Sequence, residues 1–141
     1  MQMMIFGKDK NTINWVNEQV IKSERSKIGV HMTTIAEAEI ILKSMCFDAV
    51  LYDVSQPEDD VEQTVKELLN ICGKIPLIIL TDAFTLPVAI DAVKFGADTY
   101  LVKDKAPKGL LADCLNIVIV KKREQLNKLR ITSNLKRRTK R

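Results

Sequence analysis

The sequence of 141 residues is about the length of one domain, and with 46% hydrophobic and 28% charged residues it has the composition of an ordinary soluble globular protein. No apolar run approaches the about 18 to 20 residues of a membrane span, and the N-terminus lacks the charged and apolar regions of a secretory signal, so we expect a cytoplasmic protein without membrane insertion. Residues 121–141 hold ten Lys or Arg and one acid, a net charge of +9, so residues 1–120 carry −5 of the whole-chain charge of +4.

Short apolar runs alternate with helical patterns along the chain. The expected strands are residues 3–7, 28–32, 49–52, 75–81 and 99–103. The expected helices run from Ile13 to near Ser23, over residues 33–46, from Val61 to Cys72, from Pro87 to Gly96, and from near Pro107 onward. Thr33 or Thr34 can cap the second helix. Five strand-then-helix units joined by short loops predict an α/β fold in which helices cover both faces of a five-stranded parallel sheet.

The spacing of the cysteines does not indicate a redox or metal-binding role. Cys46, Cys72 and Cys114 are odd in number and widely spaced, and they lack the spacing of metal ligands. Each stands in an apolar context, so we expect three buried structural thiols.

Asp53 is the first candidate for chemistry. The run Ala49–Tyr52 is continuously apolar, as in a central parallel strand that helices cover on both faces, and Asp53 follows it directly. In open α/β sheets, ligands and reactive groups collect beyond the carboxyl ends of the strands. A carboxylate at this point is therefore a candidate reactive group, although an Asp at a strand end can also cap a helix or turn.

Three stretches in the order FDAVLYD, IPLIILTD and AVKFGADTYLVKD close the third, fourth and fifth expected strands. With them the chain resembles the receiver domain of two-component response regulators, and the resemblance covers residues 1 to about 125. It implies a flavodoxin-like (βα)5 three-layer sandwich. We expect a receiver-like domain over residues 1–125 and a basic helical extension or tail over residues 126–141.

The resemblance also implies roles for four residues. Asp53 is the expected phosphoacceptor, Thr81 the hydroxyl that meets the phosphoryl group, Lys103 its ammonium partner and Tyr100 the aromatic rotamer switch. The residue types suit these roles, because an attacking carboxylate needs the charge on the phosphoryl oxygens to be neutralised. Taken singly, Lys103 can be a solvated charge, Thr81 a β-branched strand residue and Tyr100 a packed aromatic.

The sequence departs from the family pattern after the first strand. Receivers that use Mg²⁺ place two acidic residues there, and the matching positions here are Gly7 and Lys8, with Asp9 one residue late. Mg²⁺ prefers oxygen ligands, so a metal site depends on a shift that brings Asp9 beside Asp53 and the backbone carbonyl of Ser55.

A second departure is Asp82, which follows Thr81 where the family has a small residue. Its side chain can crowd the site and repel a phosphodonor, or it can act as a replacement metal ligand.

Lys8 predicts a specific outcome, because its ammonium can pair with Asp53 in place of a metal ion. Our hypothesis is a degenerate receiver that acts through protein interaction, without enzymatic activity beyond acceptance of phosphate on Asp53. The alternative is an ordinary Mg²⁺-dependent phospho-switch. The implied partners are a sensor histidine kinase or another signalling protein, and a homodimer is possible.

The tail needs a separate interpretation. Apolar or long side chains recur three or four residues apart at Leu115, Val118, Lys122, Leu126 and Leu129. This short seam is compatible with a dimeric helix or with a linker to another domain. The final KRRTKR can attract nucleic acid by charge alone or be a solvated end. A nucleic-acid adaptor is the third hypothesis and is not favoured, because no recognition element follows the receiver-like part.

Overall fold

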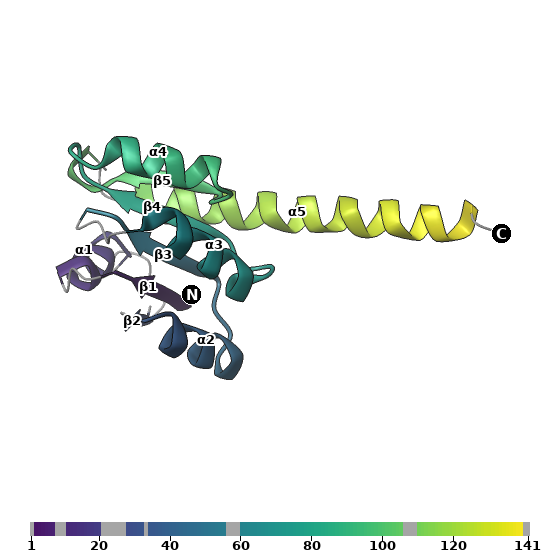
Figure 1. Cartoon of the computed structure of the whole chain (residues 1–141), viewed down its shortest axis with the longest axis horizontal. Helices are drawn as coiled ribbons and strands as arrows, with labels where there is room; N and C mark the ends of the chain where they lie inside the picture. Colours follow the sequence, from purple (N-terminus) through teal and green to yellow (C-terminus); the bar gives the residue numbers. More distant parts are fainter. Residues whose placement is uncertain are drawn as a thin grey trace.

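The computed structural model describes residues 2–7, 11–20, 28–32, 34–55, 60–105 and 110–139. Side chains are described throughout, except at residues 13, 17–20, 28–32, 112 and 130–139. Over these residues the chain forms a parallel sheet with helices on both faces (Figure 1). The parallel α/β fold that the sequence predicts is confirmed.

The sheet of the described residues has five strands in the order β2-β1-β3-β4-β5, and every neighbouring pair is parallel. The strands are β1 (Gln2–Phe6), β2 (Ile28–Met32), β3 (Ala49–Asp53), β4 (Leu77–Thr81) and β5 (Thr99–Val102). The central position of β3 explains its continuous apolar run. Ala49 and Leu51 pack into one core, Val50 and Tyr52 pack into the other, and all four are buried.

Helices cover the two faces unequally. The helices are α1 (Asn11–Val20), α2 (Ile35–Ser44), α3 (Val61–Cys72), α4 (Leu86–Lys94) and α5 (Leu110–Thr139), and a short 3₁₀ turn, η1, spans Lys103–Lys105. Side chains of α1 and α5 pack into one core, and side chains of α2, α3 and α4 pack into the other. The result is three layers with the sheet in the middle.

Side-chain caps begin two of the helices, and a glycine turn follows a third. The Thr34 hydroxyl caps α2 by accepting a hydrogen bond from the Glu37 N–H at 3.3 Å, and Asp60 caps α3 in the same way from the Gln63 N–H at 2.9 Å. After α4 the chain turns at Gly96 with φ of +126°, where an added Cβ would lie 2.8 Å from Leu69 Cδ1. Gly96 therefore ends the fourth helix and also lets α3 pack closely.

The last helix is longer than the body that it covers. Leu111, Leu115 and Val118 of α5 pack into the core, and the rest of the helix projects away from the body (Figure 1). The Lys122 ammonium forms an ion pair with Asp98 Oδ1 at 3.3 Å where the helix leaves. The helix has 30 residues and continues without a break through residue 125, where the sequence places the domain boundary.

The prediction of three buried cysteines is confirmed for Cys72, met only in part by Cys114 and wrong for Cys46. Cys72 is buried, Cys114 is half-buried and Cys46 is exposed. Cys46 is exposed because α2 ends at Ser44, and Cys46 lies in the connection to β3 instead of on the helix. Burial raises the pKa of the Cys72 thiol to about 12, with the nearby charge of Asp98 adding to the shift, so this thiol stays protonated.

In the described part of the chain, no helix combines the length and the apolar character needed to cross a membrane.

Candidate functional site

Three strands bring their carboxyl ends together at one edge of the sheet. Asp53 is the last residue of β3, Thr81 is the last residue of β4 and Lys103 follows directly after β5. The registers pair Asp53 with Leu80 and Thr81 with Val102, so the three residues stand at nearly the same height. The parallel sheet thereby gathers residues that are up to 50 positions apart in the sequence.

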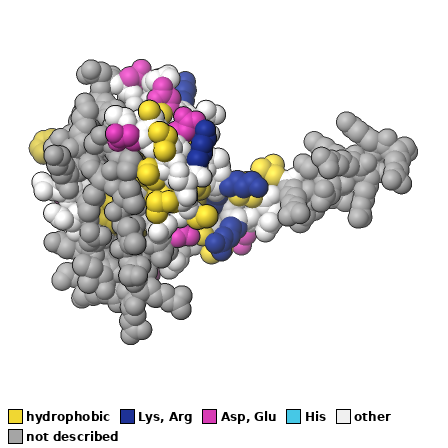
Figure 2. All heavy atoms as spheres, turned by 90° about the horizontal axis from the view of Figure 1, so that it is seen from below, with side chains coloured by type: hydrophobic (Ala, Val, Ile, Leu, Met, Phe, Trp, Pro, Cys, Tyr) yellow, Lys and Arg dark blue, Asp and Glu magenta, His cyan; other side chains and the backbone are white. Residues whose placement is uncertain are grey.

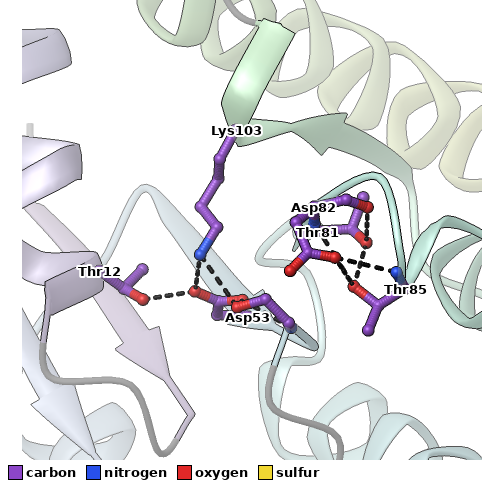
Figure 3. Close-up of polar contacts among 7 residues, drawn as sticks. Thr12, Asp53, Thr81, Asp82, Thr85 and Lys103 are labelled. Atoms are coloured by element: carbon purple, nitrogen blue, oxygen red, sulfur yellow. Dashed lines mark hydrogen bonds and ion pairs between the residues drawn. The ribbon is translucent and has the colours of Figure 1, made fainter.

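Both oxygens of the Asp53 carboxylate accept hydrogen bonds. Oδ2 accepts from the Lys103 ammonium at 2.7 Å and from the Thr12 hydroxyl, as Figure 3 shows. Oδ1 accepts from the N–H and the hydroxyl of Ser55, at 2.8 and 2.6 Å. Lys103 also donates to the Ser55 hydroxyl at 3.0 Å, which ties the group together.

The fold removes this carboxylate from water and keeps it charged. Asp53 is only 2% exposed. Burial alone would raise its pKa, but the hydrogen bonds from Lys103, Ser55 and Thr12 together outweigh burial and lower the pKa below its usual range. The site therefore holds an ionised carboxylate at neutral pH, paired with a nearly buried ammonium.

Thr81 lies beside this group but makes other contacts. Its hydroxyl lies 2.7 Å from the Thr85 hydroxyl and donates to the backbone oxygen of Asp82 at 3.0 Å. One carboxylate oxygen of Asp82 accepts from the N–H and the hydroxyl of Thr85, each at 2.9 Å, and these hydrogen bonds lower the pKa of Asp82. Tyr100 on β5 is 39% exposed, so its ring is not enclosed by the core.

Gly7 closes the site from the side of β1. Its φ is +147°, and an added Cβ would lie 3.0 Å from the backbone oxygen of Asp53 and 3.4 Å from its Cβ. A carboxylate side chain at this position would therefore need the backbone to move. Lys8 and Asp9, which the sequence proposes as the ammonium and the late acid of the site, lie outside the described residues.

A metal site is not assembled by the residues that the structure describes. Among them there is no group of three or more His, Cys, Asp or Glu side chains that could hold a metal ion. The Ser55 side chain and N–H both donate to Asp53, and Asp82 turns one oxygen toward Thr85. The described part of the site thus offers few free oxygen ligands to a hard cation such as Mg²⁺.

Two contributors were missed from the sequence. Thr12 is 2% exposed and contacts Asp53 from the first turn of α1, and Thr85 precedes the first residue of α4. A signal for Thr12 exists, because it stands four residues before the buried Val16 on the same helix face. For Thr85 the signal is its place just before a proline-containing helix start, where hydroxyl residues are common.

Solved structures share this fold. A response regulator receiver domain protein from Clostridium thermocellum aligns with a TM-score of 0.68 and 21% identity, covering 88% of this chain and 98% of that chain. Full-length FixJ from B. japonicum aligns with a TM-score of 0.73 and 18% identity, covering 97% of this chain and 66% of that chain.

Curated relatives match part of the chain in sequence. The transcriptional regulatory proteins ZraR of Klebsiella oxytoca and Escherichia coli are 36% and 37% identical over 62 residues, which is 44% of this chain. The match spans only 14% of the length of those proteins. The family model described as the response regulator receiver domain matches residues 8–114, three quarters of the chain. The chain belongs to the response regulator receiver domain family.

Proposed function

We propose that this chain is a receiver module of two-component signalling whose Asp53 site stays in a charge-paired state, and that it acts by binding another signalling protein. The observation that carries the proposal is the occupation of both Asp53 oxygens by hydrogen-bond donors from Thr12, Ser55 and Lys103. A buried carboxylate with this many donors is stable without a metal ion or a phosphoryl group.

The same contacts disfavour Mg²⁺-dependent phosphorylation. A phosphoacceptor needs one carboxylate oxygen free to attack, and a metal ion would need oxygen ligands beside it. Here Mg²⁺ would compete with the Lys103 ammonium at 2.7 Å for Oδ2. Gly7 supplies no side chain, and Lys8 adds positive charge where the family has an acid. If Mg²⁺ binds, the residues that would hold it are Asp53, Asp9 and the backbone carbonyl of Ser55.

A second candidate function is the ordinary phospho-switch. It is favoured by the ionised state of Asp53 and by the Lys103 ammonium, which could move from the carboxylate to a transferred phosphoryl group. Thr81 at the neighbouring strand end would then be the switching hydroxyl, and Tyr100 on β5 would be the aromatic that follows it. A sensor histidine kinase would be the donor.

Intact mass spectrometry after incubation with acetyl phosphate, with and without Mg²⁺, distinguishes the two functions. We expect no gain of a phosphoryl group under conditions that label an ordinary receiver. A gain that requires both Mg²⁺ and Asp53, and that Asp53→Asn abolishes, would establish the phospho-switch and overturn the proposal.

A second variant tests the cause. Lys8→Asp returns an acid to the position where the family has one, and we expect it to gain Mg²⁺-dependent labelling at Asp53. Lys10→Asp makes the same change of charge two residues further on and serves as the matched control. Equal labelling of the two variants would show that net charge, and not a ligand at residue 8, limits phosphorylation.

A further inference from the structure

Three side chains between β4 and α4 form a continuous chain of hydrogen bonds. The Thr81 hydroxyl lies 2.7 Å from the Thr85 hydroxyl, and the Thr85 hydroxyl lies 2.9 Å from Asp82 Oδ1. The Thr85 N–H also donates to Asp82 Oδ1, at 2.9 Å. The Asp82 carboxylate therefore fixes Thr85 through two hydrogen bonds, the Asp82 N–H adds a longer one to the Thr85 hydroxyl at 3.4 Å, and Thr85 in turn contacts Thr81 (Figure 3).

The direction of the chain follows from counting hydrogens. A threonine hydroxyl has one hydrogen to donate. Thr85 gives its hydrogen to the Asp82 carboxylate, because a charged acceptor makes the stronger bond. Thr81 must then donate across the 2.7 Å contact, sharing its hydrogen with the Asp82 backbone oxygen at 3.0 Å. The Thr85 hydrogen thus points to the Asp82 carboxylate, and the Thr81 hydrogen is shared between the Thr85 hydroxyl and the Asp82 backbone oxygen.

This chain is separate from the hydrogen bonds around Asp53. The side chains that donate to Asp53 are those of Thr12, Ser55 and Lys103, and Figure 3 shows Thr81, Asp82 and Thr85 as a second group beside them. Thr81 is 0% exposed, so water cannot readily replace its bond to Thr85. A hydroxyl that leaves this chain loses a partner unless it gains one at Asp53.

We propose that Asp82 and Thr85 are positioning residues that hold the Thr81 hydroxyl toward α4 and away from the Asp53 carboxylate. This role rests on the proposed function. A receiver that stays in one state needs its switching hydroxyl, that of Thr81, to be held in one position. Asp82 stands where the family resemblance leads us to expect a small residue, and its two contacts with Thr85 give this acid a role in the site.

The side-chain rotamer of Thr81 in the free protein tests the proposal directly. The three-bond couplings from Thr81 Cγ2 to its backbone nitrogen and carbonyl carbon report χ1, measured on the full chain with labelled threonine methyl groups. We expect the wild-type couplings to be those of a single rotamer. In Thr85→Val, which keeps the shape and loses the hydroxyl, the ratio of major to minor rotamer should fall about tenfold, the effect of losing about one hydrogen bond.

Conservative variants separate positioning from general stability. Thr85→Ser keeps the hydroxyl and should keep the wild-type couplings, and Asp82→Ala should average them as Thr85→Val does. Thr99→Val, a similar change on β5 outside the chain, serves as the control and should leave Thr81 unaffected. Averaged couplings in the wild type would overturn the proposal, whatever the variants do. Unchanged couplings in Asp82→Ala or in a folded Thr85→Val would also overturn it.

The readout does not depend on phosphorylation. If mass spectrometry labels Asp53 while Thr81 keeps one rotamer, the proposed function fails and the positioning role stands. If Asp53 takes no label while the Thr81 rotamer is averaged in the wild type, the positioning role fails and the proposed function stands.

Discussion

Asp53 shows how a residue that water would normally solvate is held inside a fold. Removing a carboxylate from water is costly, and the loss is offset only where donors surround it. Here the Lys103 ammonium supplies the opposite charge, while Thr12 and Ser55 satisfy the remaining oxygen lone pairs. The stability of the site therefore depends on the set of donors and not on one ion pair.

Removing the ammonium should expose this dependence. Lys103→Met leaves a buried carboxylate without its charge partner, so we expect the free energy of unfolding to fall by about 3 kcal/mol. Urea denaturation followed by circular dichroism measures the change. The double variant Lys103→Met with Asp53→Asn should recover most of the loss, because no uncompensated charge is then buried. Equal loss in the single and double variants would show that Lys103 acts through packing instead.

The pH dependence of stability follows from the lowered pKa of Asp53. A carboxyl group whose pKa is lower in the folded state stabilises the fold above its unfolded pKa of about 3.9, and this contribution is lost as the pH falls through the folded pKa. Between pH 5 and pH 3, the free energy of unfolding should therefore fall more steeply in the wild type than in Asp53→Asn. Asp91→Asn, an exposed change on α4, is the control and should keep the wild-type slope.

At the scale of single residues, the sequence predicts the carboxylate of Asp53 and its partner Lys103, but it does not predict the other hydrogen-bond donors. The sequence predicts that Asp53, Thr81 and Lys103 lie close together. Each of them ends an apolar run, and the carboxyl ends of parallel strands lie at the same edge of the sheet. The sequence does not predict the contact of Thr12 with Asp53, because their distance depends on how α1 packs against the sheet. The role of Asp82 was also open, because only its contacts with Thr85 distinguish a helix-start partner from a metal ligand.

Asp98 links the starts of β4 and β5 to the last helix, α5. Its Oδ2 accepts from the Leu77 N–H at 2.8 Å, its N–H donates to the Leu77 oxygen at 2.9 Å, and its Oδ1 pairs with Lys122 of α5. Lys122 and Asp98 are both mostly buried, with side chains 20% and 17% exposed. The pair fixes α5 at the point where it leaves the body.

Lys122→Met should loosen the helix at this point. We expect a loss of about 1 kcal/mol in the free energy of unfolding, since the pair is partly screened by solvent. Amide hydrogen exchange should accelerate in α5 around residue 122 more than in the strands. Lys121→Met removes an exposed charge from the neighbouring position and is the matched control. Identical exchange in the two variants would rule out an anchoring role for the ion pair.

Some predicted element ends differ from the observed ends by one or two residues, and local chemistry explains the differences. The strand expected from residue 75 begins at Leu77, because Pro76 carries no N–H for the ladder and contributes only its carbonyl, which accepts from Val50. The strand expected to reach residue 103 ends at Val102, and Lys103 begins a 3₁₀ turn. Cys46 lies outside α2 for a different reason, because the helical sequence pattern continues for two residues beyond the end of the helix at Ser44.

At the scale of the whole molecule, charge divides the chain into an acidic body and a basic helix. Exposed Lys121, Arg123 and Lys128 lie on α5, and Figure 2 shows Lys and Arg side chains where the helix leaves the body. Leu129 is 66% exposed on this helix, and Ile117 and Val120 are more than half exposed. The helix thus exposes apolar and basic side chains next to one another.

Truncation tests whether the projecting helix is needed for folding. Residues 126–141 hold seven Lys or Arg and no acid, so a chain that ends at residue 125 changes its net charge from +4 to −3. We expect this chain to keep the wild-type urea midpoint, because the last buried side chain that the structure describes on α5 is Val118, and the partly buried Lys122 follows it. A chain that ends at residue 114 loses Leu115 and Val118 from the core and should fail to fold cooperatively. A large loss in the first variant would contradict the predicted boundary.

The sequence by itself determined the alternation of strands and helices, the parallel sheet and the row of Asp53, Thr81 and Lys103, because each depends on apolar periodicity and on which residue follows a strand. Only the tertiary structure decided which donors surround Asp53, where the Thr81 hydroxyl points and how Asp98 anchors α5. The contacts of Thr12 with Asp53 and of Lys122 with Asp98 join residues 41 and 24 positions apart in the sequence. Their geometry is set by the packing of helices on the two faces of the sheet, and local sequence patterns carry no record of that packing.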